Sequence, residues 1–180
     1  GLVGSEMCIR DRVNDVIPGV MDGNTQVVVL GTGDSWYEEA FRSYENQYKG
    51  SFCAYIAYDE NVAHNIYSGC DALLVPSRFE PCGLTQLIAM RYGAIPIVRE
   101  TGGLRDTVWP YNMFDNTGNG FTFDRYESGL LYDTINRAKT CYFENRASWD
   151  DMVIRDMNKD VSWETSARQY KDMYVELTPR

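Results

Sequence analysis

The most informative part of this chain is the ten-residue string Ser77-Arg78-Phe79-Glu80-Pro81-Cys82-Gly83-Leu84-Thr85-Gln86. An apolar run at 72–75 precedes it and is typical of a buried strand, and a helix-like run at 87–92 follows it. Glu80 therefore lies in a strand-to-helix loop, just before the first amides of a helix, which together with the helix dipole favour an anion. A carboxylate beside an anion site suits the handling of a phosphorylated sugar. The alternative is an ordinary loop in which Glu80 caps the helix.

The segments around this string alternate between strand-like and helix-like patterns. The strand-like runs are β-branched and almost continuously apolar, which is typical of a parallel sheet covered on both faces. We therefore expect an α/β, doubly wound parallel sheet followed by C-terminal helices, with ligands at the carboxyl ends of the strands. The expected strands are 26–30, 51–57, 71–75, 94–98 and 120–123, and the expected helices are 35–48, 61–68, 83–92, a short one from 101, 125–143, 149–159 and 163–177. Ser162 is a predicted N-cap for the last helix.

The residues from Asp71 to Val108 closely resemble the donor-binding motif of glycogen and starch synthases. The resemblance is carried by the string at 77–86, by Tyr92-Gly93 and by Arg99-Glu100-Thr101-Gly102-Gly103-Leu104-Arg105-Asp106-Thr107-Val108, and it continues more weakly from about Val13 to the C-terminus. These synthases are retaining glucosyltransferases with two Rossmann-like domains, the GT-B fold. The resemblance implies that this chain is the C-terminal, nucleotide-sugar-binding half of such an enzyme, with ADP-glucose as the donor and an α-1,4-glucan as the acceptor.

The same resemblance implies roles for individual residues. Glu80 would be the catalytic carboxylate, contacting the donor sugar and stabilising the positive charge that develops on it. The donor diphosphate and sugar would lie against Cys82, Gly83, Leu84, Thr85, Thr101, Gly102 and Gly103, and the nucleotide against Tyr58, Gly31 and Gly33.

Simpler structural roles remain open for several of these residues. Gly83 and Thr85 could merely start a helix, Thr101 could be an N-cap, and Tyr58 could be a rim or core tyrosine. Cys82 has no histidine partner and is not a convincing nucleophile. Gly31-Thr32-Gly33-Asp34 lacks the third glycine of a dinucleotide fingerprint, because Trp36 stands at that position, so Gly33 is expected to permit a tight turn and Asp34 to cap a helix.

Composition limits the classes of partner. The chain has 180 residues, 44% apolar, with a net charge of −9, which disfavours general affinity for nucleic acid or an anionic membrane. Residues 72–108 hold four arginines and three acidic residues, a mildly basic stretch on an acidic body that fits a small anionic ligand or arises by chance. No apolar run approaches the roughly 18–20 residues of a membrane span.

The cysteines and the single histidine argue against metal and disulfide chemistry. Five cysteines at positions 8, 53, 70, 82 and 141 form no C-x-x-C pair, which disfavours a zinc site. The resemblance implies that the diphosphate is held without a divalent metal, which is consistent with the lack of an Asp-x-Asp motif, so we expect no metal and no cofactor beyond the donor itself. Cys53 and Cys70 are predicted to be reduced core residues, which indicates a cytosolic compartment, and the resemblance implies bacterial cytoplasm or plastid stroma.

The ends of the sequence carry a further expectation. Residues 1–12 do not fit the resemblance and look like a translated adaptor sequence, so we expect the native domain to occupy 13–180 and to be incomplete at its N-terminal edge. The resembling enzymes carry an Arg/Lys pair for the diphosphate upstream of this point, so the chain alone is expected to be inactive. The alternatives are another GT-B transferase that uses a UDP-sugar and a non-catalytic Rossmann-type binding module.

Overall fold

The computed structural model of the protein describes residues 2–3 and 7–178. Every element expected from the sequence forms, with its ends within three residues of the expected positions. Among the described residues the elements are β1 (Leu2–Val3), α1 (Met7–Val20), β2 (Val27–Leu30), α2 (Ser35–Gln47), β3 (Phe52–Tyr55), α3 (Glu60–Gly69), β4 (Ala72–Val75), α4 (Thr85–Tyr92), β5 (Ile95–Arg99), α5 (Gly102–Thr107), β6 (Phe121–Phe123), α6 (Ser128–Glu144), α7 (Arg146–Met157) and α8 (Trp163–Leu177).

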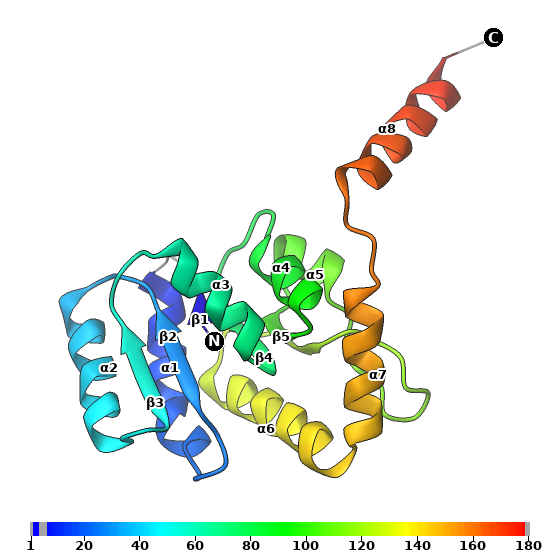
Figure 1. The fold of residues 1–180 in the computed structure, drawn as a ribbon. Helices are drawn as coiled ribbons and strands as arrows, with labels where there is room; N and C mark the ends of the chain where they lie inside the picture. Colours follow the sequence, from blue (N-terminus) through cyan, green and yellow to red (C-terminus); the bar gives the residue numbers. More distant parts are fainter. Residues whose placement is uncertain (1, 4–6, 179–180) are drawn as a thin grey trace.

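All of the strand pairings are parallel. The strands form two three-stranded sheets, in the order β1-β2-β3 and β4-β5-β6. Because β1 also contacts β4, the six strands follow one another as β3-β2-β1-β4-β5-β6. The helices between them cover the sheet (Figure 1), which confirms the predicted α/β, doubly wound architecture.

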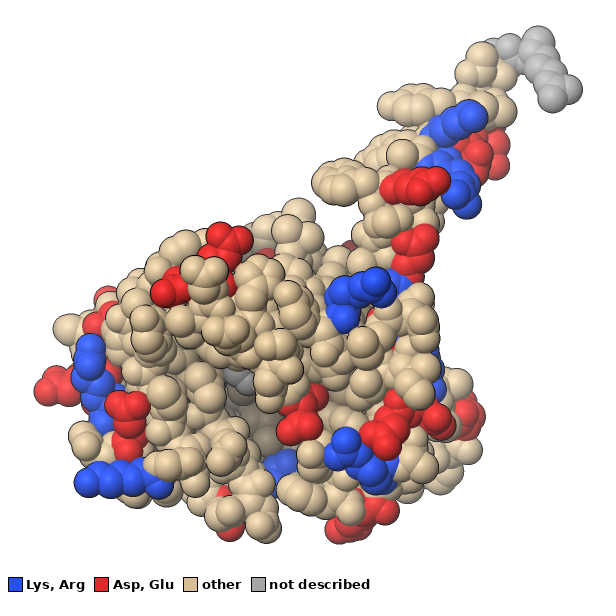
Figure 2. Space-filling model, viewed as in Figure 1, with Lys and Arg blue, Asp and Glu red and all other residues tan. Residues whose placement is uncertain are grey.

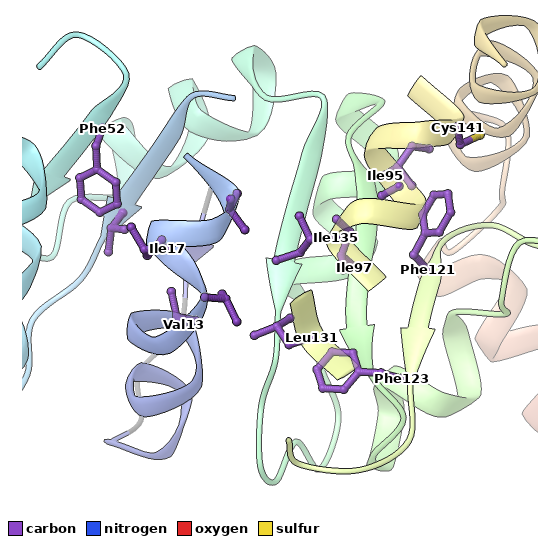
Figure 3. Close-up of a cluster of buried hydrophobic side chains, with 14 of the residues drawn as sticks. Val13, Ile17, Phe52, Ile95, Ile97, Phe121, Phe123, Leu131, Ile135 and Cys141 are labelled. Carbon is purple, nitrogen blue, oxygen red and sulfur yellow. The ribbon is translucent and has the colours of Figure 1, made fainter. Parts of the chain in front are cut away.

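Two apolar cores lie on opposite faces of the strands. The larger core joins α1, α2, α6 and α7 to the strands, and Figure 3 shows Leu131 and Ile135 of α6 among the side chains of Ile97 and Phe123. The smaller core joins α3, α4 and α5 to β4 and β5 through residues such as Leu73, Met90 and Leu104. The strands β5 and β6 are buried on both faces, so their near-continuous apolar sequences have a direct physical cause.

The strand β3 departs from the expectation of a sheet covered on both faces. It lies at the edge of its sheet, and its residues alternate between buried and exposed. Cys53 is consequently exposed, so the prediction that it is a core residue was wrong. Cys70 is half-buried against the smaller core, and the thiols of Cys53, Cys70, Cys82 and Cys141 are free.

A cavity of about 750 Å³ interrupts the middle of the sheet at the amino ends of the strands. It lies between β2 and β4 because β1 is only two residues long and pairs with Val29 and Leu30 alone. Its walls come from α1, α3 and α6 as well as the two strands. Figure 2 shows the corresponding hollow in the surface.

The helix α1 crosses the expected start of the native domain at Val13. It begins at Met7, and from Val13 onward its apolar side chains are buried in the larger core. Figure 3 shows Val13 and Ile17 among the buried side chains of this core, with Ile17 near Phe52 of β3. The origin of residues 1–12 stays a prediction.

The last helix, α8, projects away from the body of the molecule (Figure 1) and buries none of its residues. Ser162 caps it as predicted, accepting a hydrogen bond from the Thr165 amide. Tyr170, Met173 and Tyr174 of this helix are exposed. In the described part of the chain, no helix is both long and apolar enough to cross a membrane.

A buried carboxyl group lies where α7 meets the 108–120 loop. Asp156 is only 2% exposed, and neither of its carboxyl oxygens accepts a hydrogen bond of normal geometry. Burial raises the pKa of Asp156 to about 7, although Lys159, Arg155 and the Asn119 amide oppose that rise. The Lys159 ammonium in turn donates to the Thr107 carbonyl at 2.8 Å and lies over the Trp109 ring.

We predict that Asp156 makes the fold less stable as pH rises from about 4 to 8. The folded chain binds the carboxyl proton more tightly than the unfolded chain, so the proton is lost from the folded state at a cost. As the pH rises from 4 to 8, the unfolding free energy of wild type should fall by on the order of 2–4 kcal/mol relative to that of Asp156→Asn, measured by urea denaturation.

Asp133→Asn, at an exposed position of α6, is the matched control. The quantity compared is the change in unfolding free energy with pH. The unfolding free energies of the Asn variant and the protonated wild type can differ by an amount that does not depend on pH. A wild type and an Asn variant whose stabilities run parallel from pH 4 to 8 would contradict a buried, neutral Asp156.

Candidate functional site

The sequence-predicted site residues follow the carboxyl ends of four strands. Gly31 and Gly33 follow β2, Tyr58 follows β3, the loop containing Glu80 follows β4, and Thr101 follows β5. Carboxyl ends of parallel strands meet at one edge of a sheet, so all of these residues lie along the same edge, where open α/β sheets bind ligands.

Main-chain contact joins the Glu80 loop (76–84) to the start of α5. A Cβ atom on Gly102 would lie 1.9 Å from the carbonyl oxygen of Glu80, and one on Gly103 would lie 1.8 Å from that of Cys82. Only glycine lets the two backbones approach so closely. Gly102 also has a φ of +45°, in the left-handed region that favours glycine.

Glu80 is held at both its main chain and its side chain. Its carbonyl accepts a hydrogen bond from the Gly103 amide at 3.2 Å. Its half-buried carboxylate accepts one from the hydroxyl of the buried Ser77 at 3.3 Å. The carboxylate therefore lies beside Ser77, in the loop that leads into α4.

Glu80 does not cap α4. The N-cap position of that helix is occupied by Leu84, and no side chain forms a capping hydrogen bond there. The alternative of Glu80 as a simple helix cap is thus wrong. Thr85 is the first residue of the helix, and Leu84 is 68% exposed. The amides that begin an α-helix lack intrahelical partners, so they can receive an anion at this point.

A buried hydrogen-bond network fixes the start of α4 against α5. The Gln86 amide donates to the Gly83 carbonyl at 2.7 Å and to the Thr107 hydroxyl at 3.0 Å, and that hydroxyl donates to the Gly103 carbonyl at 2.6 Å. Gly83 has a φ of +64°, which its carbonyl needs to meet Gln86. Sequence reasoning did not single out Ser77, Gln86 or Thr107; a polar Gln86 on the buried side of α4 was the available signal.

Thr101 occupies the N-cap position of α5 but forms no capping hydrogen bond with its side chain. The α5 amide nearest the Glu80 loop, that of Gly103, is already bonded to Glu80. Gly102 and Gly103 therefore support the loop directly, whatever contact the α5 end also makes with a ligand.

The residues predicted to meet the nucleotide lie in separate loops. Tyr58 is 94% exposed, so it is not a core tyrosine. The Gly33 amide donates to the Glu38 carboxylate at 2.7 Å. Asp34 takes the N-cap position of α2 as expected, but its side chain accepts no capping hydrogen bond. Among the described residues, no hydrogen bond or ring contact joins Tyr58 to the Glu80 loop.

Cys82 is exposed at the rim of the loop. In the part of the chain that the structure describes, no three His, Cys, Asp or Glu side chains gather into a group that could hold a metal ion.

Comparison with known proteins places this site in a family. The model of glycosyl transferases group 1 matches residues 11–153, which include all of the site residues above. The chain belongs to the glycosyl transferases group 1 family.

Similar members of this family include synthases of storage glucans. The chain is 47% identical over 167 residues to a glycogen synthase of Lachnoclostridium phytofermentans, covering 93% of this chain and 35% of that protein. It is 46% identical over 169 residues to the chloroplastic/amyloplastic soluble starch synthase 1 of Solanum tuberosum, covering 92% and 26%. The chain thus spans about a third of the length of the curated glycosyltransferases it matches.

Solved glycosyltransferase structures share the fold. The catalytic domain of starch synthase IV from Arabidopsis thaliana, bound to ADP and acarbose, matches 98% of this chain and 37% of that one, with a TM-score of 0.82 and 33% identity. The sucrose-phosphate synthase of Thermosynechococcus elongatus matches with a TM-score of 0.67 at 21% identity, which supports the fold alone. The predicted GT-B, Rossmann-like architecture is confirmed.

We predict that Gly103→Ala disrupts the contact between the two loops. The new methyl group must displace the Cys82 carbonyl, which is main chain and cannot rotate away. The unfolding free energy should fall by about 2–3 kcal/mol, measured by urea denaturation.

Gly129→Ala on α6 is the matched control, because nothing lies within 4 Å of the added methyl group. It should leave stability unchanged or raise it by up to about 1 kcal/mol. Equal stabilities for the two variants would mean that the loops separate without penalty.

Proposed function

We propose that this chain is the nucleotide-sugar-binding part of a glycogen or starch synthase. The whole enzyme transfers glucose, with retention of configuration, from ADP-glucose to the non-reducing end of an α-1,4-glucan. The observation that carries the proposal is Glu80, held by Ser77 and Gly103 in the loop that leads into α4, in a chain 46–47% identical to glycogen and starch synthases. The likeness to a starch synthase that was solved with ADP supports the choice of nucleotide.

The division of labour within the site follows from its chemistry. The unpartnered amides at the start of α4, with the Thr85 hydroxyl, bind the donor diphosphate, and the dipole of the helix favours that negative charge. Gly83 lets the backbone come close to the phosphates. Because these groups supply the electrostatic stabilisation, the reaction needs no metal ion or other cofactor.

Glu80 acts on the sugar and not on the phosphates. As the bond from the anomeric carbon to the diphosphate breaks, positive charge develops on the sugar ring, and a fixed carboxylate nearby lowers the energy of that state. The leaving phosphate accepts the proton of the attacking glucan hydroxyl on the same face of the sugar. Glu80 therefore stabilises charge without forming a covalent bond.

The nucleotide lies between the loops that follow β2 and β3. The exposed ring of Tyr58 stacks on adenine, and the loop of Gly31 and Gly33 borders the same space. The glucan acceptor is held by the remaining two thirds of the enzyme, so the 180-residue chain alone transfers no glucose.

We predict that ADP stabilises this chain against thermal unfolding, whereas UDP and NAD do not. A ligand at 100 times its Kd adds about 2.7 kcal/mol, which raises the Tm of a protein of this size by roughly 5–10 °C. A shift with UDP alone would favour a UDP-sugar transferase, and a shift with NAD would favour a dinucleotide-binding module. The absence of any shift in a cooperatively unfolding sample would contradict a nucleotide site within this chain.

The role of Glu80 is tested in a chimera in which residues 13–178 replace the matching third of the Lachnoclostridium phytofermentans glycogen synthase. Glu80→Gln keeps the shape of the side chain and removes its charge. We expect kcat with ADP-glucose to fall by about 10²–10³ while KM changes little, since the charge is needed only in the transition state. Equal changes in kcat and in donor affinity would show that Glu80 only shapes the pocket.

A further inference from the structure

Arg99, the last residue of β5, donates hydrogen bonds to three backbone carbonyls from three different nitrogens. Its Nε donates to the Ser77 carbonyl at 2.9 Å, its Nη1 to that of Asp124 at 3.3 Å, and its Nη2 to that of Arg78. Ser77 and Arg78 belong to the Glu80 loop, and Asp124 directly follows β6. One side chain therefore ties together the loops that leave three neighbouring strands.

The contacts of Arg99 depend on the shape of its guanidinium group. Within the described residues Arg99 forms no ion pair with a carboxylate, and its charge is met by carbonyl dipoles and by the ring of Tyr126 at 5.9 Å. Each of the three carbonyls accepts from a different nitrogen, which suits the rigid fork of arginine and not the single ammonium group of lysine. The same nitrogens are thus occupied by the protein itself, which argues against Arg99 as a direct phosphate ligand.

The loop that Arg99 holds is the one that orients Glu80. The carbonyl of Ser77 accepts from Arg99, and the hydroxyl of Ser77 donates to the Glu80 carboxylate at 3.3 Å. On the far side of the loop, the Gly103 amide donates to the Glu80 carbonyl. Arg99 and the α5 glycines therefore fix the loop from two directions, with Glu80 between them.

We propose that Arg99 is a positioning residue that sets the direction of the Glu80 carboxylate through Ser77. Its loss lets the loop move and lowers turnover, and leaves the binding of the nucleotide intact. This inference rests on the proposed function for its effect on catalysis, but its structural part, the ordering of the loop, is independent of which donor the enzyme uses.

The structural part is tested in the 180-residue chain by hydrogen exchange of the Gly103 amide, which bonds to the Glu80 carbonyl. Arg99→Lys keeps the charge and removes the fork. We expect the exchange of this amide to become at least about tenfold faster, while Tm and the affinity for ADP stay close to those of wild type. Arg105→Lys, at an exposed arginine of α5, is the matched control.

The catalytic part is tested in the chimera with ADP-glucose and UDP-glucose as alternative donors. With whichever donor wild type uses, Arg99→Lys should lower kcat by about 10–100-fold and change KM by less than threefold, because a small displacement of a reacting group has large effects on rate. Ser77→Ala should lower kcat in the same way. The double variant should be no worse than the more affected single variant, since both act through one contact.

The outcomes separate the two proposals. Unchanged exchange at Gly103 in Arg99→Lys overturns the positioning role, as does full additivity of the Arg99 and Ser77 effects. A rise in donor KM with kcat unchanged would also overturn it, and would instead make the guanidinium fork of Arg99 a direct ligand of the diphosphate. Absence of transfer from ADP-glucose by the wild-type chimera contradicts the proposed function, and the exchange experiment still decides the inference.

Discussion

The site depends on one constraint, the main-chain contact between the Glu80 loop and the start of α5. Carbonyl oxygens of Glu80 and Cys82 occupy the space in which any residue other than glycine would place its Cβ atom. The contact is possible because β4 and β5 are adjacent parallel strands, so the loops that leave them emerge side by side. The position of Glu80, the turn at Gly83 and the direction of α4 all follow from this approach of two backbones.

The two halves of the sheet support their loops to different degrees. The strands β5 and β6 are buried on both faces, between cores that involve seven of the described helices, α1–α7. The half made of β1, β2 and β3 has an exposed edge and borders the cavity beside the two-residue β1. The loop with Glu80 therefore belongs to the better-packed half, whereas the loops with Gly33 and Tyr58 follow strands with fewer buried neighbours. Such a division places Glu80 on the more rigid support and leaves the loops with Gly33 and Tyr58 freer to adjust.

Much of this arrangement could be predicted from local pattern. The positions of β4 and β5 were predicted closely, because both are apolar runs that become buried strands. The end of α4 was predicted because Gly93, which follows it, adopts the left-handed conformation that ends a helix. Cys53 was misplaced because an apolar run does not reveal whether its strand lies at an edge. The cap of α2 was also misjudged, because the Asp34 side chain accepts no capping hydrogen bond, and the residue type at that position does not reveal this. The contacts of Gln86 and Arg99 join segments about 20 residues apart, and no local pattern contains them.

The contact between the loops has a consequence for how such a site can diverge. It is made by peptide groups, so the side chains of residues 79–82 contribute little to holding the two loops together, and several of them, including Phe79 and Cys82, face solvent. Substitutions at Phe79, Pro81 and Cys82 can therefore change the surface that the loop presents, while the geometry of the scaffold persists. Surface chemistry and support are encoded in different residues, so descendants of one ancestral sequence can change this surface without rebuilding the sheet beneath it.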